Sequence, residues 1–285
     1  MNTTETQQDT TQPLQRLREI MKRLRDPHNG CPWDRVQTFA SLVPHTLEEA
    51  YEVASSIEQN HLGELRDELG DLLFQVVFYS QIAQEQGLFD LDDVAAAICD
   101  KLERRHPHVF GNAQVADADA QTVAWEQLKA AERHGRDPDA GILDGIAAAL
   151  PALTRAAKLQ RRAARVGFDW PAIAPVMDKV VEELDELRTE LDRGAGEARV
   201  RDEVGDLLFV CVNLARHAGV DPEQALRGSN AKFERRFRHI EVAMRRKGID
   251  IADAGLAQMD ALWDEAKGQE DNTASAAANE AGKTV

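Results

Sequence analysis

Apolar residues along most of the chain recur at the three- and four-residue spacing of one helix face. Leu14, Leu17, Met21 and Leu24 are the first example, and they predict a helix over 13–25. No stretch shows the strict alternation of a strand, so the sequence predicts an all-α fold of helical bundles. The same spacing, bounded by Gly and Pro, predicts further helices over 62–86, 91–105, 122–133, 150–165, 175–192, 199–218, 222–247 and 256–267.

One more helix start depends on a proline. Pro44 disfavours a helix interior, and it is followed by Thr46. Thr46 with Glu49 three residues later is the pattern of a capping box. We therefore expect this helix to begin at Thr46 and to end near Glu58.

Two acidic patterns occur twice in the chain. In the second half, E-E-x-x-E and E-x-x-D are formed by Glu182, Glu183, Glu186, Glu203 and Asp206. The first half has the same patterns at nearly the same spacing, again followed by Asp-Leu-Leu-Phe, at Glu48, Glu49, Glu52, Glu68 and Asp71. Because each copy occupies about half of the chain, the repeat indicates two homologous domains rather than the short units of a solenoid. We expect domains over 13–135 and 150–267, a linker over 136–149, and disordered segments over 1–12 and 268–285.

The charge and cysteine content exclude several functions. A net charge of −16 argues against nucleic-acid or anionic-membrane binding as the main task. The three cysteines are far apart and form no C-x-x-C, which indicates neither a zinc site nor a disulfide framework and fits a reducing cytoplasm. No apolar run is long enough to span a bilayer, and the N-terminus has no signal-peptide pattern. We therefore expect a soluble, cytoplasmic protein.

The repeated acids have the spacing of a metal site. Residues three or four apart share a helix face, so two helices broken at 192–196 can present four carboxylates to one another. Carboxylates gathered in this way repel one another and raise one another's pKa, and a hard divalent cation relieves the repulsion. Oxygen ligands suit Mg²⁺, with Mn²⁺ or Ca²⁺ as alternatives. One such stretch alone is more often a solvated helix face, but its repetition favours the metal site.

Basic and aromatic residues are repeated as well. Lys101 and Arg105 match Lys232 and Arg236, and each pair lies on one helix face. Beside the acids, such pairs favour a phosphate clamp over surface cations that balance nearby charge. A Trp followed four residues later by a Lys could stack on a base and contact a phosphate, or be a core Trp with an extended Lys. This second pattern occurs at Trp125 with Lys129 and at Trp263 with Lys267.

Together these motifs resemble the MazG family of nucleoside triphosphate pyrophosphohydrolases. The resemblance covers about 13–267 and includes both sets of acids, 30–34, 101–110, 166–170 and 232–237. It implies an all-α, Mg²⁺-dependent enzyme that converts NTP to NMP and pyrophosphate. It also implies a homodimer and a house-cleaning role against non-standard or excess nucleotides.

The resemblance also implies roles for individual residues. It makes Glu183, Glu186, Glu203 and Asp206 metal ligands, and Glu182 either a water-activating base or a ligand of a second metal. It implies that Lys232 and Arg236 contact the triphosphate and that Trp263 contacts the nucleotide. Lys179, one turn before the acids, is expected to reach a phosphate. The matching residues of the first half are Glu49, Glu52, Glu68, Asp71, Lys101, Arg105 and Trp125.

Two functions of other classes fit parts of the pattern. The first is a non-catalytic helical scaffold that binds divalent cations. The second is a di-iron carboxylate protein, because Glu58-x-x-His61 and Glu103-x-x-His106 have the Glu-x-x-His spacing of di-iron bundles. The repeat has no histidine at either matching position, which counts against the second.

The two halves differ at two polar positions. Asn213 lies two helical turns after Asp206 on the same face, and its counterpart is Phe78. Asn230 precedes Lys232 by two residues, and its counterpart is Cys99. An Asn can donate to a phosphate or sugar oxygen, whereas a Phe cannot. We therefore expect the second half to perform most of the hydrolysis; the alternative is that both Asn residues only cap or bridge helices.

Overall fold

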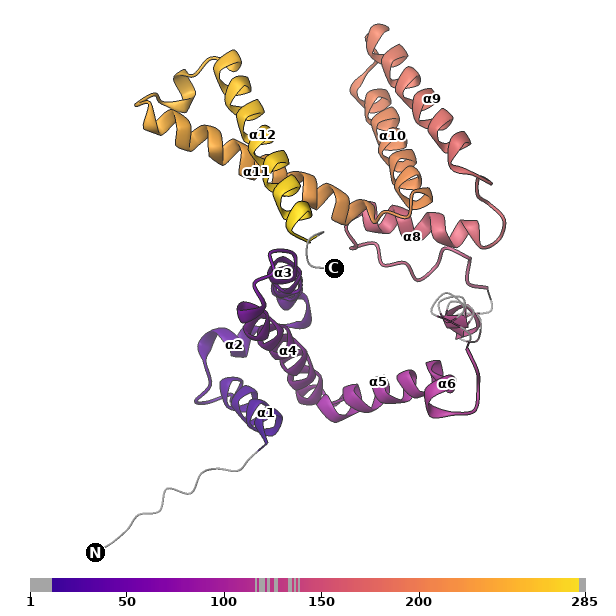
Figure 1. The fold of residues 1–285 in the computed structure, drawn as a ribbon. Helices are drawn as coiled ribbons and strands as arrows, with labels where there is room; N and C mark the ends of the chain where they lie inside the picture. The colour runs from indigo at the N-terminus through magenta and orange to yellow at the C-terminus, as the bar shows by residue number, and fades with distance from the viewer. Residues whose placement is uncertain are drawn as a thin grey trace, which may run out of the picture. The chain divides into compact units, whose positions relative to one another are not determined.

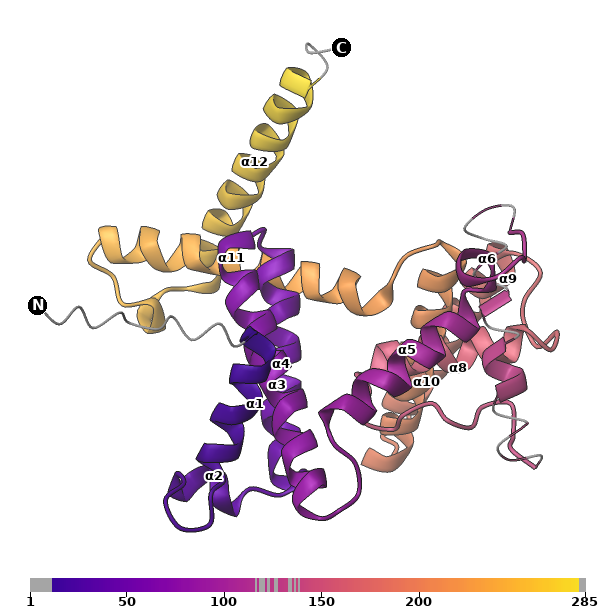
Figure 2. The ribbon, with the colours of Figure 1, turned by 90° about the horizontal axis from the view of Figure 1, so that it is seen from below.

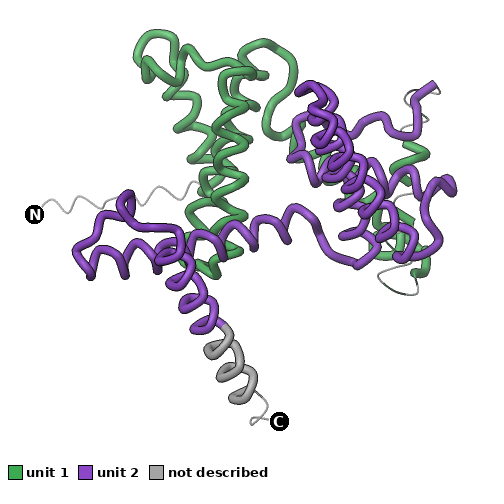
Figure 3. The backbone as a smooth tube through the Cα atoms, turned by 90° about the horizontal axis from the view of Figure 1, so that it is seen from above, with its two compact units in different colours: residues 1–136 green, residues 137–285 purple. Residues whose placement is uncertain are grey.

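The chain is all-α in the computed structural model. The structure describes residues 12–115, 117, 121, 124–125, 128–132, 135, 137 and 139–281, with side chains up to residue 270, and no strand occurs among them. These residues belong to two compact units, 1–136 and 137–285 (Figure 3). The predicted fold class is confirmed.

Unit 1 is built around one helix pair. α3 (Phe39–Glu58) and α4 (Leu62–Glu85) lie side by side (Figures 1 and 2), and α1 (Pro13–Leu24) packs on α4. Apolar side chains of these three helices form the core, with Met21, Leu42, Val77, Phe78 and Ile82 at its centre. The unit also contains α2 (Pro32–Val36), α5 (Leu91–Arg105) and α6 (Pro107–Phe110). The predicted helix over 122–133 lies partly outside the described residues; Trp125 and 128–132 within it are helical.

Unit 2 repeats the helix pair. α9 (Ile173–Asp192) packs on α10 (Glu197–His217), and α8 (Ala152–Ala164) packs on α10. α11 (Pro222–Arg246) forms a second pair with α12 (Leu256–Ala281), and a 3₁₀ turn, η1 (Ile251–Asp253), precedes α12. Ile240, Met244 and Leu262 form the core between α11 and α12.

Each acidic helix pair is closed by the same kind of turn. After α9, Gly194 has φ +65°, and the amide of Ala195 donates to the carbonyl of Glu190 over 2.9 Å. After α3, Asn60 has φ 57°, and the amide of His61 donates to Ser56 over 2.8 Å. A left-handed residue with this longer bond is the usual end of a helix. It lets the two helices of each pair run antiparallel, so that their acidic faces meet.

Two sequence predictions about helix ends are wrong. α3 begins at Phe39, not at Thr46, because Thr38 and Ser41 form the capping box, with bonds of 3.2 and 2.9 Å. Pro44 therefore lies inside the helix, and the hydroxyl of Thr46 bonds to the carbonyl of Leu42. α12 continues to Ala281, whereas we predicted a disordered tail from Gly268. The Ala-rich composition explains the extension, because alanine has the highest helix propensity.

Candidate functional site

Three carboxylates of unit 2 meet between α9 and α10. Glu183 comes from α9, and Glu203 and Asp206 come from α10. One carboxylate oxygen of each lies within 4.8 Å of the others. Glu183 and Glu203 are only 6% and 7% exposed, whereas Asp206 is open to solvent. The group is therefore buried on one side and accessible on the other.

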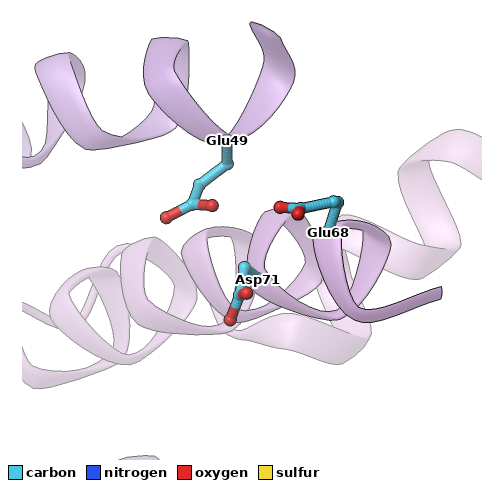
Figure 4. Close-up of side chains that lie close together, drawn as sticks. All are labelled: Glu49, Glu68 and Asp71. Atoms are coloured by element: carbon cyan, nitrogen blue, oxygen red, sulfur yellow. The ribbon is translucent and has the colours of Figure 1, made fainter. Parts of the chain in front are cut away.

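Unit 1 has the matching group. Glu49 extends from α3, and Glu68 and Asp71 extend from α4 (Figure 4). Their oxygens also lie within 4.8 Å of one another. The fourth predicted ligands, Glu52 and Glu186, belong to neither group of three. Each lies close enough to interact electrostatically with the group of its own unit. Glu52 helps to raise the pKa of Glu49, and Glu186 helps to raise the pKa of Glu203.

Burial and the charges of neighbouring acids raise the pKa of three of these carboxyls, Glu49, Glu68 and Glu203. Burial is the main cause that raises the pKa of Glu49, and the charges of Asp71 and Glu52 add to it. The pKa of Glu68 is raised by burial and then by Glu52. The pKa of Glu203 is raised by burial, Glu186 and Asp206, although Arg199, 3.1 Å away, opposes the shift. A cation bound among these oxygens would favour their ionised forms.

Glu183 has one oxygen that no hydrogen bond satisfies. Its Oε1 lies 2.7 Å from Lys179 Nζ, which also bonds to Glu182 over 2.8 Å. The bond with Glu182 is the larger cause of a raised pKa of Lys179, and the contact with Glu183 raises it further. The Oε2 atom of Glu183 is buried and has no hydrogen-bond partner. A buried carboxylate oxygen without a partner is costly, and an all-oxygen set of ligands suits Mg²⁺ or Mn²⁺. The residues present therefore fit a hard divalent cation.

The predicted phosphate arginines are paired with acids that the sequence analysis missed. Arg236 Nη2 lies 2.7 Å from Glu270, and its guanidinium lies 5.4 Å from the ring of Trp263. Arg105 pairs with Glu132 and, with Arg104, lowers the pKa of that carboxyl to about 2. Both acids stand seven residues after the repeated Trp, as Trp-x₃-Lys-x₂-Glu. Extending the repeat by three residues would have found them.

A cavity of about 330 Å³ adjoins the carboxylates of unit 2. Glu183, Asp206 and Lys179 are among the residues that line it, and so is Asn213. Its other lining side chains are mainly apolar and come from the segment before α8, from α8, from the loop before α9, and from α10. The cavity thus connects the carboxylates to an apolar space within the same unit.

The remaining predicted substrate residues do not line this cavity. Asn230 and Lys232 are exposed on α11, and Lys267 is exposed on α12. Trp263 packs against the core between these helices and against Phe233, at 5.4 Å between ring centroids. In unit 1, Trp125 donates from Nε1 to the carbonyl of Arg105 over 2.9 Å, and Lys101 is partly buried. Within unit 2, the predicted phosphate residues Lys232 and Arg236 therefore do not line the cavity, whereas Glu183, Asp206 and Lys179 do.

Comparison with known proteins identifies the family. The model of the MazG nucleotide pyrophosphohydrolase domain matches residues 37–110 and 174–241. The chain belongs to the MazG family. It is 51% identical to the nucleoside triphosphate pyrophosphohydrolase of Escherichia coli K12, over 90% of this chain and 98% of that protein. It is 40% identical to the nucleoside triphosphate pyrophosphohydrolase/pyrophosphatase MazG of Thermotoga maritima, over 90% of this chain and 96% of that protein.

The two matched segments coincide with the repeat. Each MazG segment contains one acidic helix pair and one of the Lys/Arg pairs, which confirms the resemblance and the tandem arrangement. The scaffold and di-iron alternatives lose their support, since the relatives are named as hydrolases of nucleotides. Neither carboxylate group found among the described residues contains a histidine. Within the same part of the chain, no helix combines the length and hydropathy required to cross a bilayer.

Proposed function

We propose that this MazG protein hydrolyses nucleoside triphosphates to nucleoside monophosphate and pyrophosphate. The reaction uses Mg²⁺, with Mn²⁺ as a substitute, and takes place at Glu183, Glu203 and Asp206 with Glu186 beside them. The buried, unpartnered Oε2 of Glu183 is the observation that carries the proposal. We place the activity in the cytoplasm, as a house-cleaning reaction on the nucleotide pool, in keeping with three free cysteines.

The chemistry needs no covalent nucleophile. Water attacks one phosphorus atom beside the α–β bridging oxygen, the bond to that oxygen breaks, and a proton must leave the water. The bound cation supplies charge neutralisation on the phosphate oxygens. Glu182 is our proposed acceptor of the proton, and the same Lys179 holds it beside Glu183. Lys232 and Arg236 are our proposed contacts of the departing pyrophosphate.

The first test measures products over a panel of NTPs and dNTPs. We expect pyrophosphate release with Mg²⁺ or Mn²⁺, little or none with EDTA, and no equivalent release of orthophosphate. Orthophosphate as the main product would place the cleaved bond elsewhere in the triphosphate. Unchanged release in EDTA would contradict the role of the cation.

We also propose that the protein is a homodimer. Large apolar side chains on α9 and α10 are exposed, and these are Val181, Leu184, Val204, Leu208 and Phe209. Phe233 and Phe237 on α11 are exposed too, beside Lys232 and Arg236. A patch of this kind commonly marks an interface between proteins. A second copy can cover it and bring cations of α11 to the carboxylates of its partner.

Light scattering tests the dimer. We expect a mass twice the 31.6 kDa of one chain. Leu208→Asp places a charge on the exposed patch, where the side chain is 54% accessible, so it should yield folded monomers with reduced activity. A wild-type mass of one chain at assay concentration would contradict the proposal.

A further inference from the structure

The lining of the cavity in unit 2 includes two polar side chains, Gln160 and Asn213, whose hydrogen-bonding roles are fixed. Gln160, on α8, is 8% exposed, and its Nε2 donates to the carbonyl of Phe209 over 2.8 Å. A carbonyl can only accept, so the amide nitrogen must face it and Oε1 must point elsewhere. Gln160 is one of the residues that line the cavity, and its Oε1 atom is buried without a hydrogen-bond partner. Gln160 therefore offers a fixed, unused acceptor.

Asn213 supplies the opposite function in the same wall. It is 3% exposed, and its Oδ1 accepts from Arg216 Nε over 3.0 Å and from Nη2 over 2.6 Å. Since a guanidinium can only donate, the oxygen must face Arg216 and the amide nitrogen is left as a donor. No hydrogen bond from this nitrogen occurs among the described residues. An acceptor and a donor thus remain available in one apolar cavity.

Aromatic side chains complete the cavity. Phe168 and Trp170 line it from the loop before α9, and both are exposed. Asp169 between them ties this loop to α10, since it accepts from Arg216 Nη1 over 2.9 Å and lies 3.1 Å from His217 Nε2. Arg216 therefore fixes both the aromatic loop and the orientation of Asn213.

Among the described residues of unit 1, a buried aromatic ring fills the matching position. Phe78 replaces Asn213, is fully buried, and packs on Trp33 and Phe74 at 6.4 and 5.7 Å between ring centroids. The guanidinium of Arg25 covers the same ring at 5.4 Å. His45 replaces Lys179, four residues before the first acid of the group. The acids are duplicated, whereas Asn213 beside them is not.

We propose that the cavity of unit 2 binds the nucleobase of the substrate and reads one edge of it. An N–H of the base donates to Gln160 Oε1, and Asn213 Nδ2 donates to the neighbouring acceptor of the base. Each common base has such a donor beside an acceptor, and aromatic side chains are the usual stacking partners of an unpaired base. The inference rests on the proposed function, since the triphosphate must then extend from this cavity to Glu183 and Asp206.

Titration calorimetry with Mg²⁺ and α,β-methylene-ATP, in which the α–β bridging oxygen is replaced by carbon, tests this assignment. Gln160→Met keeps the length of the side chain and removes the acceptor, so the Kd should rise about tenfold. The matched control is Gln75→Met, which removes another buried amide with an unpartnered oxygen, in unit 1, and should leave the Kd within about twofold of wild type. Inorganic pyrophosphate, which has no base, should bind Gln160→Met as it binds wild type.

A modified ligand tests the same contact without a variant. The N⁶,N⁶-dimethyl form of the analogue has lost both N–H groups of the adenine amine, so wild type should bind it about tenfold more weakly. Gln160→Met should show no further loss with this ligand, because the contact is already absent. Equal binding of the parent analogue by wild type and folded Gln160→Met overturns the inference, as does equal binding of both ligands by wild type. Absence of pyrophosphate release from any NTP by wild type would instead contradict the proposed function.

Discussion

Asp206→Ala and Glu186→Ala should each lower Mg²⁺-dependent NTP turnover at least about 100-fold. Asp206 contributes an oxygen to the group with Glu183 and Glu203, and Glu186 acts on Glu203 electrostatically. Loss of either carboxylate removes charge that the cation needs. Turnover should be measured as initial rates of pyrophosphate release at saturating NTP and Mg²⁺.

Two control variants distinguish the loss of a metal ligand from the loss of any negative charge on these helices. Asp185→Ala and Asp202→Ala remove exposed acids next in sequence to Glu186 and Glu203, outside the group of three. Both variants should retain most of the wild-type rate. Wild-type rates for both Asp206→Ala and Glu186→Ala would refute the assignment of the site.

The apo-protein should not be destabilised by Asp206→Ala. The charge of Asp206 helps to raise the pKa of Glu203, so without metal the ionised pair opposes folding. A raised pKa means that stability is gained as pH falls and lost as pH rises through the ordinary range of a carboxyl group. At neutral pH in EDTA, the variant should therefore unfold at the wild-type temperature or above it. Added Mg²⁺ should raise the midpoint of wild type more than that of the variant.

A matched pair of double variants should show that unit 2 performs most of the hydrolysis. Glu186→Ala/Asp206→Ala should abolish pyrophosphate release, whereas Glu52→Ala/Asp71→Ala should retain at least about half of the wild-type rate. The reason is the space beside the acids: in unit 1, Phe78 and its aromatic neighbours fill the position at which unit 2 has Asn213. An aromatic ring there can neither donate to a nucleotide nor leave room for one.

The comparison requires that both double variants fold and assemble alike. Light scattering and thermal unfolding provide that check. A larger loss in Glu52→Ala/Asp71→Ala than in the second-unit pair, with equal assembly, would reverse the assignment of the units.

The meeting of three acids in each unit was predictable because it depends on local spacing. Glu203 and Asp206 share a face of one helix whatever surrounds it, and the repeat showed that the spacing is not accidental. The start of α3 was not predictable from Pro44 alone. The bonds between Thr38 and Ser41 satisfy the first turn and offset a proline that propensity would place outside the helix.

Contacts between segments far apart in the chain could not be predicted from the sequence. Nothing near Gln160 shows that its nitrogen bonds to a carbonyl 49 residues away while its oxygen stays unpartnered. The ion pair of Asp169 with Arg216 likewise depends on how α8 and α10 position the loop before α9. Such tertiary contacts decide what the cavity can bind, and periodicity does not reveal them. The acids that pair with Arg105 and Arg236 could have been predicted, because Glu132 and Glu270 stand at the same position of the repeat.

³¹P NMR of one reaction tests the central claim most directly, with ATP, Mg²⁺ and either wild-type protein or Asp206→Ala. For wild type we predict that the three phosphate signals of ATP are replaced by those of AMP and pyrophosphate, in equal amounts. The variant should leave ATP intact over the same time. Signals of ADP and orthophosphate with wild type, or AMP and pyrophosphate formed as fast by the variant, would contradict the account.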